Sequence, residues 1–255
     1  MIYIAFTIFT LLILLFVFYQ WQYFMIFSPL YYREEVLCQE CTLLSMKTDE
    51  GIELEGALYE PKEPKSTLLV FVGRSHDAVG LMNRFVKLYP HTRIISFNYR
   101  SYGKSQGIAS EKNLFADGLK IAKLVKKNYG DFYLLGFSIG SSVAAYVASN
   151  VQPKALFLLG AFSSITSLVK IKYKLNFSSL LRYRFNTKDF VQNIDAPTYL
   201  FVSKVDEIVS IESARELKES VKNLQYYQES DILSHKELLW DSSSVCIIKK
   251  IINST

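Results

Sequence analysis

The hydrophobic pattern opens with a long apolar segment at the N-terminus. Residues 1–32 carry no charged side chain, and residues 2–19 are almost wholly apolar, interrupted by Thr7 and Thr10, whose hydroxyls can bond within a helix. About 20 helical residues, each rising about 1.5 Å, cross a hydrocarbon core of roughly 30 Å. The pattern therefore predicts a membrane-spanning helix.

Aromatic residues that suit the membrane interface follow this segment. They are Trp21, Tyr23, Tyr31 and Tyr32. The alternatives are a buried or interfacial helix and a cleaved signal peptide, which would have a shorter apolar region, a preceding Lys or Arg, and small residues at its cleavage site. We expect an uncleaved single-pass anchor over residues 1–32. Arg33, followed at once by Glu34 and Glu35, leaves the side of the membrane open.

The pattern of the remaining chain, residues 33–255, is typical of one α/β domain. Residues 42–47 and 52–59 flank the turn Thr48-Asp49-Glu50-Gly51, which predicts an antiparallel hairpin. Continuous apolar runs then alternate with helical stretches. The expected strands are 67–72, 93–97, 132–136, 155–159, 198–202 and 223–229, and the expected helices are 79–89, 111–129, 139–150, 211–218 and 242–252. This alternation predicts a mostly parallel sheet of the eight-stranded type with helices on both faces.

The alternation lapses over residues 161–195, where short aromatic and basic segments follow one another. In an open α/β sheet this insert would lie over the carboxyl ends of the strands, where ligands bind. We expect a short lid or a wall of the substrate pocket. Its basic residues favour a solvated face with apolar side chains turned inward, and contact with anionic lipid headgroups is the alternative.

Composition narrows the function classes. Half of the 255 residues are hydrophobic, 21% are charged, and the net charge is +5. Without a recognisable basic binding module, this mild charge does not favour a nucleic-acid partner. The motif Cys38-Gln39-Glu40-Cys41 lacks a second pair that would complete a zinc site. We expect incidental free thiols there, with a local redox-sensitive pair as the alternative.

The pentapeptide Gly136-Phe137-Ser138-Ile139-Gly140 fits the pattern G-x-S-x-G and stands between a predicted buried strand and a helix rich in small residues. A sharp turn in this setting exposes a serine hydroxyl, and the glycines avoid collisions with neighbouring strands. The helix N-terminus would offer the Ile139 amide to a developing oxyanion. Ser138 is therefore a candidate nucleophile.

A serine nucleophile needs a base held by an acid. Of the three histidines, His76 and His91 precede the serine, whereas His235 follows the last predicted strand. Asp206 follows the preceding strand, so the order is Ser, Asp, His, as expected on this fold. A solvated His235 and a helix-capping Asp206 are the alternative interpretations. Glu207 and Asp231 are weaker candidates for the acid.

The segment Asn98-Tyr99-Arg100-Ser101-Tyr102-Gly103-Lys104-Ser105-Gln106-Gly107 is similar to the D-Y-R-G-Y-G-x-S-x-G segment of the membrane-anchored α/β hydrolases related to the fungal bud-emergence hydrolases. The resemblance covers nearly the whole chain and implies their fold and catalytic machinery. Where that family has H-G-N, this chain has Val72-Gly73-Arg74, so the second oxyanion donor would be the Arg74 amide. Asn98 and Ser101 replace Asp and Gly, which would relax the loop without touching the chemistry.

These observations lead to the hypothesis of a serine hydrolase that cleaves an ester or thioester through an acyl-enzyme, without a metal or organic cofactor. The anchor and the aromatic insert favour a small or lipid-like apolar acyl substrate at the membrane. Amide or peptide cleavage by the same residues is an alternative. A further alternative is a non-catalytic, membrane-tethered interaction protein that retains the fold.

Overall fold

The computed structural model describes residues 2–30, 37–174 and 178–254. Within them one eight-stranded sheet has the order β1-β2-β4-β3-β5-β6-β7-β8. Its strands are β1 (Cys41–Lys47), β2 (Glu53–Tyr59), β3 (Ser66–Phe71), β4 (Thr92–Phe97), β5 (Tyr133–Phe137), β6 (Leu156–Leu159), β7 (Thr198–Ser203) and β8 (Leu224–Ser230). The pairs β1–β2 and β2–β4 are antiparallel and the other neighbouring pairs are parallel. The predicted mostly parallel sheet is confirmed.

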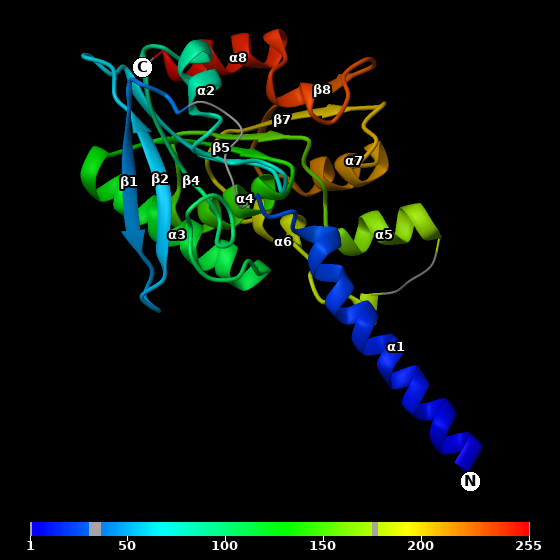
Figure 1. Cartoon of the computed structure of the whole chain (residues 1–255). Helices are drawn as coiled ribbons and strands as arrows, with labels where there is room; N and C mark the ends of the chain where they lie inside the picture. The colour runs from blue at the N-terminus through cyan, green and yellow to red at the C-terminus, as the bar shows by residue number, and fades with distance from the viewer. Residues whose placement is uncertain (1, 31–36, 175–177, 255) are drawn as a thin grey trace.

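Helices cover both faces of this sheet (Figure 1). They are α1 (Ile2–Ile26), α2 (Met82–Leu88), α3 (Glu111–Tyr129), α4 (Ile139–Val151), α5 (Ile165–Tyr173), α6 (Thr187–Val191), α7 (Ile211–Ser220) and α8 (Ser242–Ile252), with 3-10 turns η1 (Ser178–Leu180) and η2 (Glu237–Leu239). One hydrophobic cluster unites the sheet with α3, α4, α6 and α7, and the other unites it with α2 and α8.

The alternation of side chains along β3 explains its continuous apolar sequence. Leu69 and Phe71 belong to the cluster under α3 and α4, whereas Leu68 and Val70 belong to the cluster under α2 and α8. All four side chains are buried. A central parallel strand that is covered on both faces has no solvent-facing positions, so polar residues would be costly at each of them.

The N-terminal part of helix α1 projects away from the body, and its C-terminal part lies beside the body (Figure 1). Every residue from Tyr3 to Trp21 is exposed, whereas Gln22 and Phe27 are buried. The exposed part rises about 28 Å at about 1.5 Å per residue, close to the thickness of a bilayer core. By length and composition α1 is long and apolar enough to cross a membrane. Tyr31, Tyr32 and residues 33–35 lie outside the described residues.

The end of α1 and the residue that follows it pack against the insert. The ring of Phe27 meets Tyr183 edge to face, with 5.0 Å between the ring centroids, and also packs against Phe185. Arg184, between these two buried aromatic residues, is exposed. This alternation fits the interpretation of the basic stretch as a solvated face with apolar side chains turned inward.

Helix α2 is shorter than the predicted helix over 79–89. The backbone amide of Ala78 donates to Asn98 Oδ1 at 2.7 Å, and the amide of Val79 donates to Asp77 Oδ1 at 3.1 Å. Side chains thus bind the amides that would begin the longer helix. Because these hydrogen bonds hold the segment as a turn, the helix begins at Met82.

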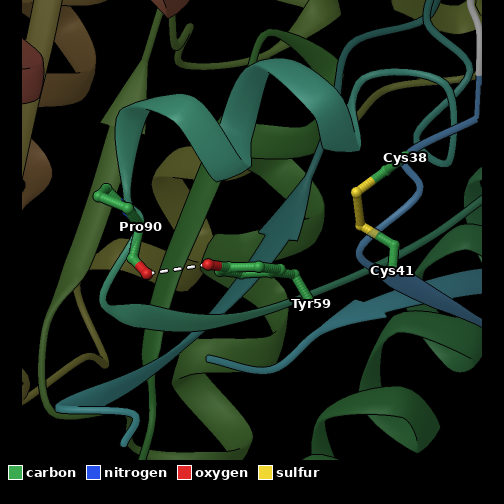
Figure 2. The surroundings of a disulfide bond; sticks show 4 residues. All are labelled: Cys38, Cys41, Tyr59 and Pro90. Atoms are coloured by element: carbon green, nitrogen blue, oxygen red, sulfur yellow. Dashed lines mark hydrogen bonds between the residues drawn. A yellow bond between two sulfur atoms is a disulfide. The ribbon is translucent and has the colours of Figure 1, made fainter. Parts of the chain in front are cut away.

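The expectation of free thiols at Cys38 and Cys41 is wrong, because the two residues form a disulfide. Figure 2 shows the bond at the start of β1, where Cys41 pairs with Tyr59; the Tyr59 hydroxyl points away from the bond and donates to the Pro90 carbonyl at 3.0 Å. A turn brings the two Cα atoms to 5.2 Å, which suits a disulfide. The two cysteines are three positions apart in the sequence, a separation that this turn closes.

Candidate active site

The G-x-S-x-G turn joins β5 directly to α4. Ser138 has a φ of 55° and a ψ of −123°, a backbone conformation that residues other than glycine rarely adopt. A Cβ on Gly136 would lie 2.5 Å from the Gly140 carbonyl oxygen, and one on Gly140 would lie 2.2 Å from the Phe71 carbonyl oxygen. Both glycines are therefore required by the close approach of the backbone.

His235 lies within hydrogen-bond distance of both Ser138 and Asp206. Its Nε2 is 2.9 Å from Ser138 Oγ, and its Nδ1 is 2.7 Å from Asp206 Oδ2. Because the carboxylate accepts the proton of Nδ1, Nε2 is left to accept a proton from the serine hydroxyl. His235 is only 6% exposed, so it is not a solvated loop residue. The structure brings together the three residues that the sequence nominated from distant positions.

Asp206 is itself held by the backbone of its own loop. Its Oδ1 accepts hydrogen bonds from the amides of Ile208 and Val209, both at 2.8 Å. The cap of helix α7 is Ser210, so the helix-capping interpretation of Asp206 does not apply. Two amide donors on one oxygen leave the other oxygen directed at His235. The orientation of the carboxylate is therefore fixed before any substrate binds.

The weaker acid candidates lie elsewhere. Glu207 Oε2 accepts a hydrogen bond from the backbone amide of His235 at 3.0 Å, which ties the two loops together. Asp231 forms an exposed ion pair with Lys204 at 2.7 Å. Neither contact involves the imidazole ring. Of these acidic residues, Asp206 is the one that contacts the ring.

A pocket of about 230 Å³ opens beside Ser138. It is lined by Gly73, Arg74, Ser75, His76, Phe137, Ser138, Glu207, Ile208, His235 and Lys236. The loop after β3 thus forms one wall, and the loops that carry Glu207 and His235 form the other. This volume suits the reacting part of a substrate but lies below the roughly 300–1,000 Å³ of a pocket for a drug-sized ligand.

Arg74 has a role that the sequence did not indicate. Its guanidinium donates to the backbone carbonyl of Met25 near the end of α1, and its own carbonyl accepts from the Tyr102 hydroxyl at 2.6 Å. The same Tyr102 oxygen accepts from the Ser28 amide at 3.0 Å. These bonds fasten the loop after β3 to the end of α1. One guanidinium nitrogen of Arg74 is thus held by the end of α1, while the residue also lines the pocket beside Ser138.

Ile139 is the first residue of α4 and directly follows Ser138. Backbone amides at a helix N-terminus lack intrahelical partners, and the helix dipole favours negative charge there. With the loop at Arg74 lining the same pocket, the amides of Ile139 and Arg74 remain the candidates for an oxyanion hole.

His76 is a pocket residue that sequence reasoning set aside because it precedes the serine. Its ring meets Phe137 edge to face at 5.6 Å. Burial is the largest cause that lowers the pKa of His76 from 6.5 to about 4. A backbone hydrogen bond with Gly73 opposes this shift, and the charges of Lys236 and Arg84 add to it. His76 is therefore neutral near pH 7. Its place two residues after Arg74, in the loop that follows a buried strand, is the signal that could have nominated it.

The expectation that Asn98 relaxes its loop is wrong. Asn98 is 2% exposed, and its side-chain amide nitrogen donates to Glu55 Oε2 at 3.0 Å and to Asp77 Oδ1 at 2.7 Å. Ser101 has a φ of 72°, and its hydroxyl donates to the Gly107 carbonyl at 2.8 Å. These hydrogen bonds hold the loop in place.

Over the described ranges 2–30, 37–174 and 178–254, no group of three or more His, Cys, Asp or Glu side chains is placed to hold a metal ion. The chemistry that this arrangement can perform is that of a serine nucleophile with a histidine base.

No model of a known protein family matches the chain. The chain is similar to an uncharacterized protein of Acanthamoeba polyphaga mimivirus, with 26% identity over 204 residues, which cover 71% of this chain and 69% of that protein. It is also similar to lysophosphatidylserine lipase ABHD12 of Danio rerio, with 25% identity over 148 residues. That match covers 49% of this chain but only 38% of the lipase.

Solved structures establish the fold. An esterase from Pyrococcus furiosus matches with a TM-score of 0.70 and 18% identity, covering 89% of this chain and 99% of the esterase. Acetyl xylan esterase from Paenibacillus sp. R4 matches with a TM-score of 0.70 and 14% identity, covering 88% of this chain and 89% of that esterase. The chain has the α/β-hydrolase fold, and together with the lipase similarity this supports membership of the α/β-hydrolase superfamily.

Proposed function

We propose that this protein is a serine hydrolase that cleaves an ester or thioester through an acyl-enzyme. The observation that carries the proposal is the hydrogen-bonded series Ser138, His235 and Asp206, with separations of 2.9 and 2.7 Å. The similarity to a lipase and the shared fold with esterases support ester hydrolysis. The loop after β3 has Val72-Gly73-Arg74 where the resembling family has H-G-N, and this difference leaves the hydrogen-bonded series intact.

In the proposed reaction, His235 Nε2 takes the proton from the Ser138 hydroxyl as Oγ attacks the acyl carbon. The carbonyl oxygen becomes an oxyanion beside the amides of Ile139 and Arg74. His235 then gives the proton to the leaving alcohol or thiol, which departs with the bonding electrons. Water repeats the sequence on the acyl-enzyme and releases the acid. Such a base increases the reaction rate about 10²–10⁴-fold, and one oxyanion donor increases it by a similar factor.

A fluorophosphonate probe tests the nucleophile. The wild-type protein should be labelled and should hydrolyse p-nitrophenyl butyrate, whereas Ser138→Ala should do neither. Ser149→Ala is the matched control, because Ser149 lies near the far end of α4 and its hydroxyl donates to the Tyr146 carbonyl at 2.8 Å. It should behave as the wild type does. Wild-type labelling no stronger than that of folded Ser138→Ala would refute the proposal and favour an interaction protein.

We also propose that α1 is an uncleaved membrane anchor and that the chain belongs to the membrane-anchored branch related to the bud-emergence hydrolases. The burial of Gln22 supports the anchor over a signal peptide, because cleavage after α1 would remove the hydrogen bonds of Gln22 to Leu180 and Arg182. Mass spectrometry of the purified protein should find residues 2–26 retained. Recovery of the intact protein in the soluble fraction after lysis would contradict membrane anchoring.

A further inference from the structure

A second cavity, of about 500 Å³, lies between α1 and the insert. Its thirteen lining residues come from α1, α5 and the segment around η1, and all except Gln22 are aliphatic, aromatic or methionine. On α5 the lining positions are Ile165, Val169 and Tyr173, which are four residues apart and so share one face of the helix. We call this cavity the α1–α5 groove.

Hydrogen bonds join α1 to the insert at the α1–α5 groove. Gln22 is 5% exposed, and its side-chain amide donates to the Leu180 carbonyl at 2.9 Å and accepts from the Arg182 amide at 2.8 Å. The Arg182 guanidinium lies over the ring of Tyr19, 4.7 Å from its centroid. Since backbone groups satisfy the polar atoms of Gln22, the groove has an apolar interior despite this polar residue.

The two ends of the groove reach different surroundings. Leu14, Leu15 and Phe18 line one end and belong to the exposed part of α1 that we assign to the bilayer. Met25 lines the other end, and its carbonyl accepts the hydrogen bond from Arg74, which lines the pocket beside Ser138. Arg74 therefore contacts a residue of the groove and also lines the catalytic pocket. The groove extends along α1 from its exposed apolar turns toward the turn that binds Arg74.

We infer that the α1–α5 groove binds the long acyl chain of a lipid substrate, which enters from the bilayer beside α1. This inference rests on the proposed serine hydrolase function and adds the substrate class. The catalytic pocket of about 230 Å³ holds the reacting ester, and the groove holds the chain that this pocket cannot accommodate. Its volume lies within the roughly 300–1,000 Å³ of small-molecule sites.

The size of the groove favours an acyl chain over a partner helix. A helix about 10 Å across with a pitch of about 5.4 Å occupies about 420 Å³ per turn. The groove would hold little more than one such turn. A flexible hydrocarbon chain carries no polar groups to desolvate and can follow an apolar groove of this volume.

The test compares tryptophan substitutions at two β-branched residues of α5. Val169 lines the groove, whereas Ile171 lies on another face of the helix, in a hollow shared with Lys170 and Lys188. The full-length protein in detergent micelles is assayed with p-nitrophenyl butyrate and p-nitrophenyl palmitate. Val169→Trp should lower the palmitate-to-butyrate ratio of kcat/KM at least tenfold, which corresponds to about two buried methylenes. Ile171→Trp should leave the ratio within twofold.

An equal ratio in Val169→Trp and the wild type would overturn the inference while leaving the hydrolase function intact. A binding measurement that needs no catalysis separates the two proposals. Ser138→Ala protein is irradiated with a palmitate analogue that carries a terminal diazirine, and cross-linked peptides are identified by mass spectrometry. Cross-links should map to α1 and α5 and disappear when Val169→Trp is added. Their absence, or capture confined to another polypeptide, would overturn the inference even if esters are hydrolysed.

Discussion

Replacement of Asp206 by Asn tests whether the carboxylate sets the protonation of His235. In the wild type, Oδ1 accepts from the amides of Ile208 and Val209, and Oδ2 accepts from His235 Nδ1. The carboxamide oxygen of Asn must stay with the two backbone donors. Its NH₂ group then faces Nδ1, which must become an acceptor. The ring proton moves to Nε2, where it faces Ser138 and prevents that nitrogen from acting as the base.

The structure sets the size of the effect. Restoring the active tautomer requires the carboxamide to flip, which leaves the two backbone amides facing an NH₂ group. Ile208 is exposed and Val209 is buried, so the unsatisfied buried amide of Val209 sets the cost of the flip at about 1–3 kcal/mol. At about 1.36 kcal/mol per decade this corresponds to roughly 5-fold to 160-fold. The substitution also removes the negative charge of Asp206, which stabilises the imidazolium that forms on His235. We therefore expect kcat to fall at least 10³-fold.

The assay is hydrolysis of p-nitrophenyl butyrate by detergent-solubilised protein, with thermal unfolding as the check on folding. Asp231→Asn is the matched control, since this carboxylate follows the neighbouring strand but pairs with Lys204. It should retain wild-type kcat. If folded Asp206→Asn keeps more than a tenth of wild-type kcat, the assignment of the base to the Ser138–His235–Asp206 series is refuted.

Three further predictions concern the support of the site. Gly140→Ala places a Cβ 2.2 Å from the Phe71 carbonyl oxygen, so it should lower the free energy of unfolding by about 1–3 kcal/mol. The Tm should decrease and fluorophosphonate labelling should be abolished. An unchanged Tm would contradict the close approach. Cys38→Ser opens a loop of four residues and should lower the free energy of unfolding by about 2 kcal/mol with kcat unchanged. If a reductant does not shift the Tm of the wild-type protein, that result argues against the disulfide. His76 has its pKa lowered to about 4 by burial, so below pH 6.5 the unfolded chain binds a proton that the folded chain excludes. The free energy of unfolding, measured with urea, should therefore decrease as the pH is lowered, by about 3 kcal/mol at pH 4. His76→Phe should lack this part of the pH dependence.

Local sequence was informative wherever one short segment decides the outcome. Helix α3 spans Glu111–Tyr129 and α8 spans Ser242–Ile252, the ranges that the pattern predicted. Ser110 and Asp241 cap them by accepting from backbone amides within the first turn. Caps and periodicity act over three or four residues, so they can be read from the chain without its tertiary contacts.

Prediction was wrong where distant residues compete for the same backbone groups. Asn98 was expected to relax its loop, yet it binds the Ala78 amide and thereby delays the start of α2. The Arg74 guanidinium binds the Met25 carbonyl, 49 residues away in the sequence, which no pattern near Arg74 indicated. A hydrogen-bond donor has no preferred partner until the fold supplies an acceptor, so no local pattern encodes these bonds.

The sequence by itself determined the buried parallel strands, the turn at Ser138, the order of Ser138, Asp206 and His235, and the apolar character of α1. Each follows from the spacing of hydrophobic residues or from residue types that one turn requires. Only the tertiary structure decided that the last turns of α1 pack on the insert and form the α1–α5 groove. Hydrophobic spacing shows that a face is buried, but shape and hydrogen-bond geometry decide which partner buries it.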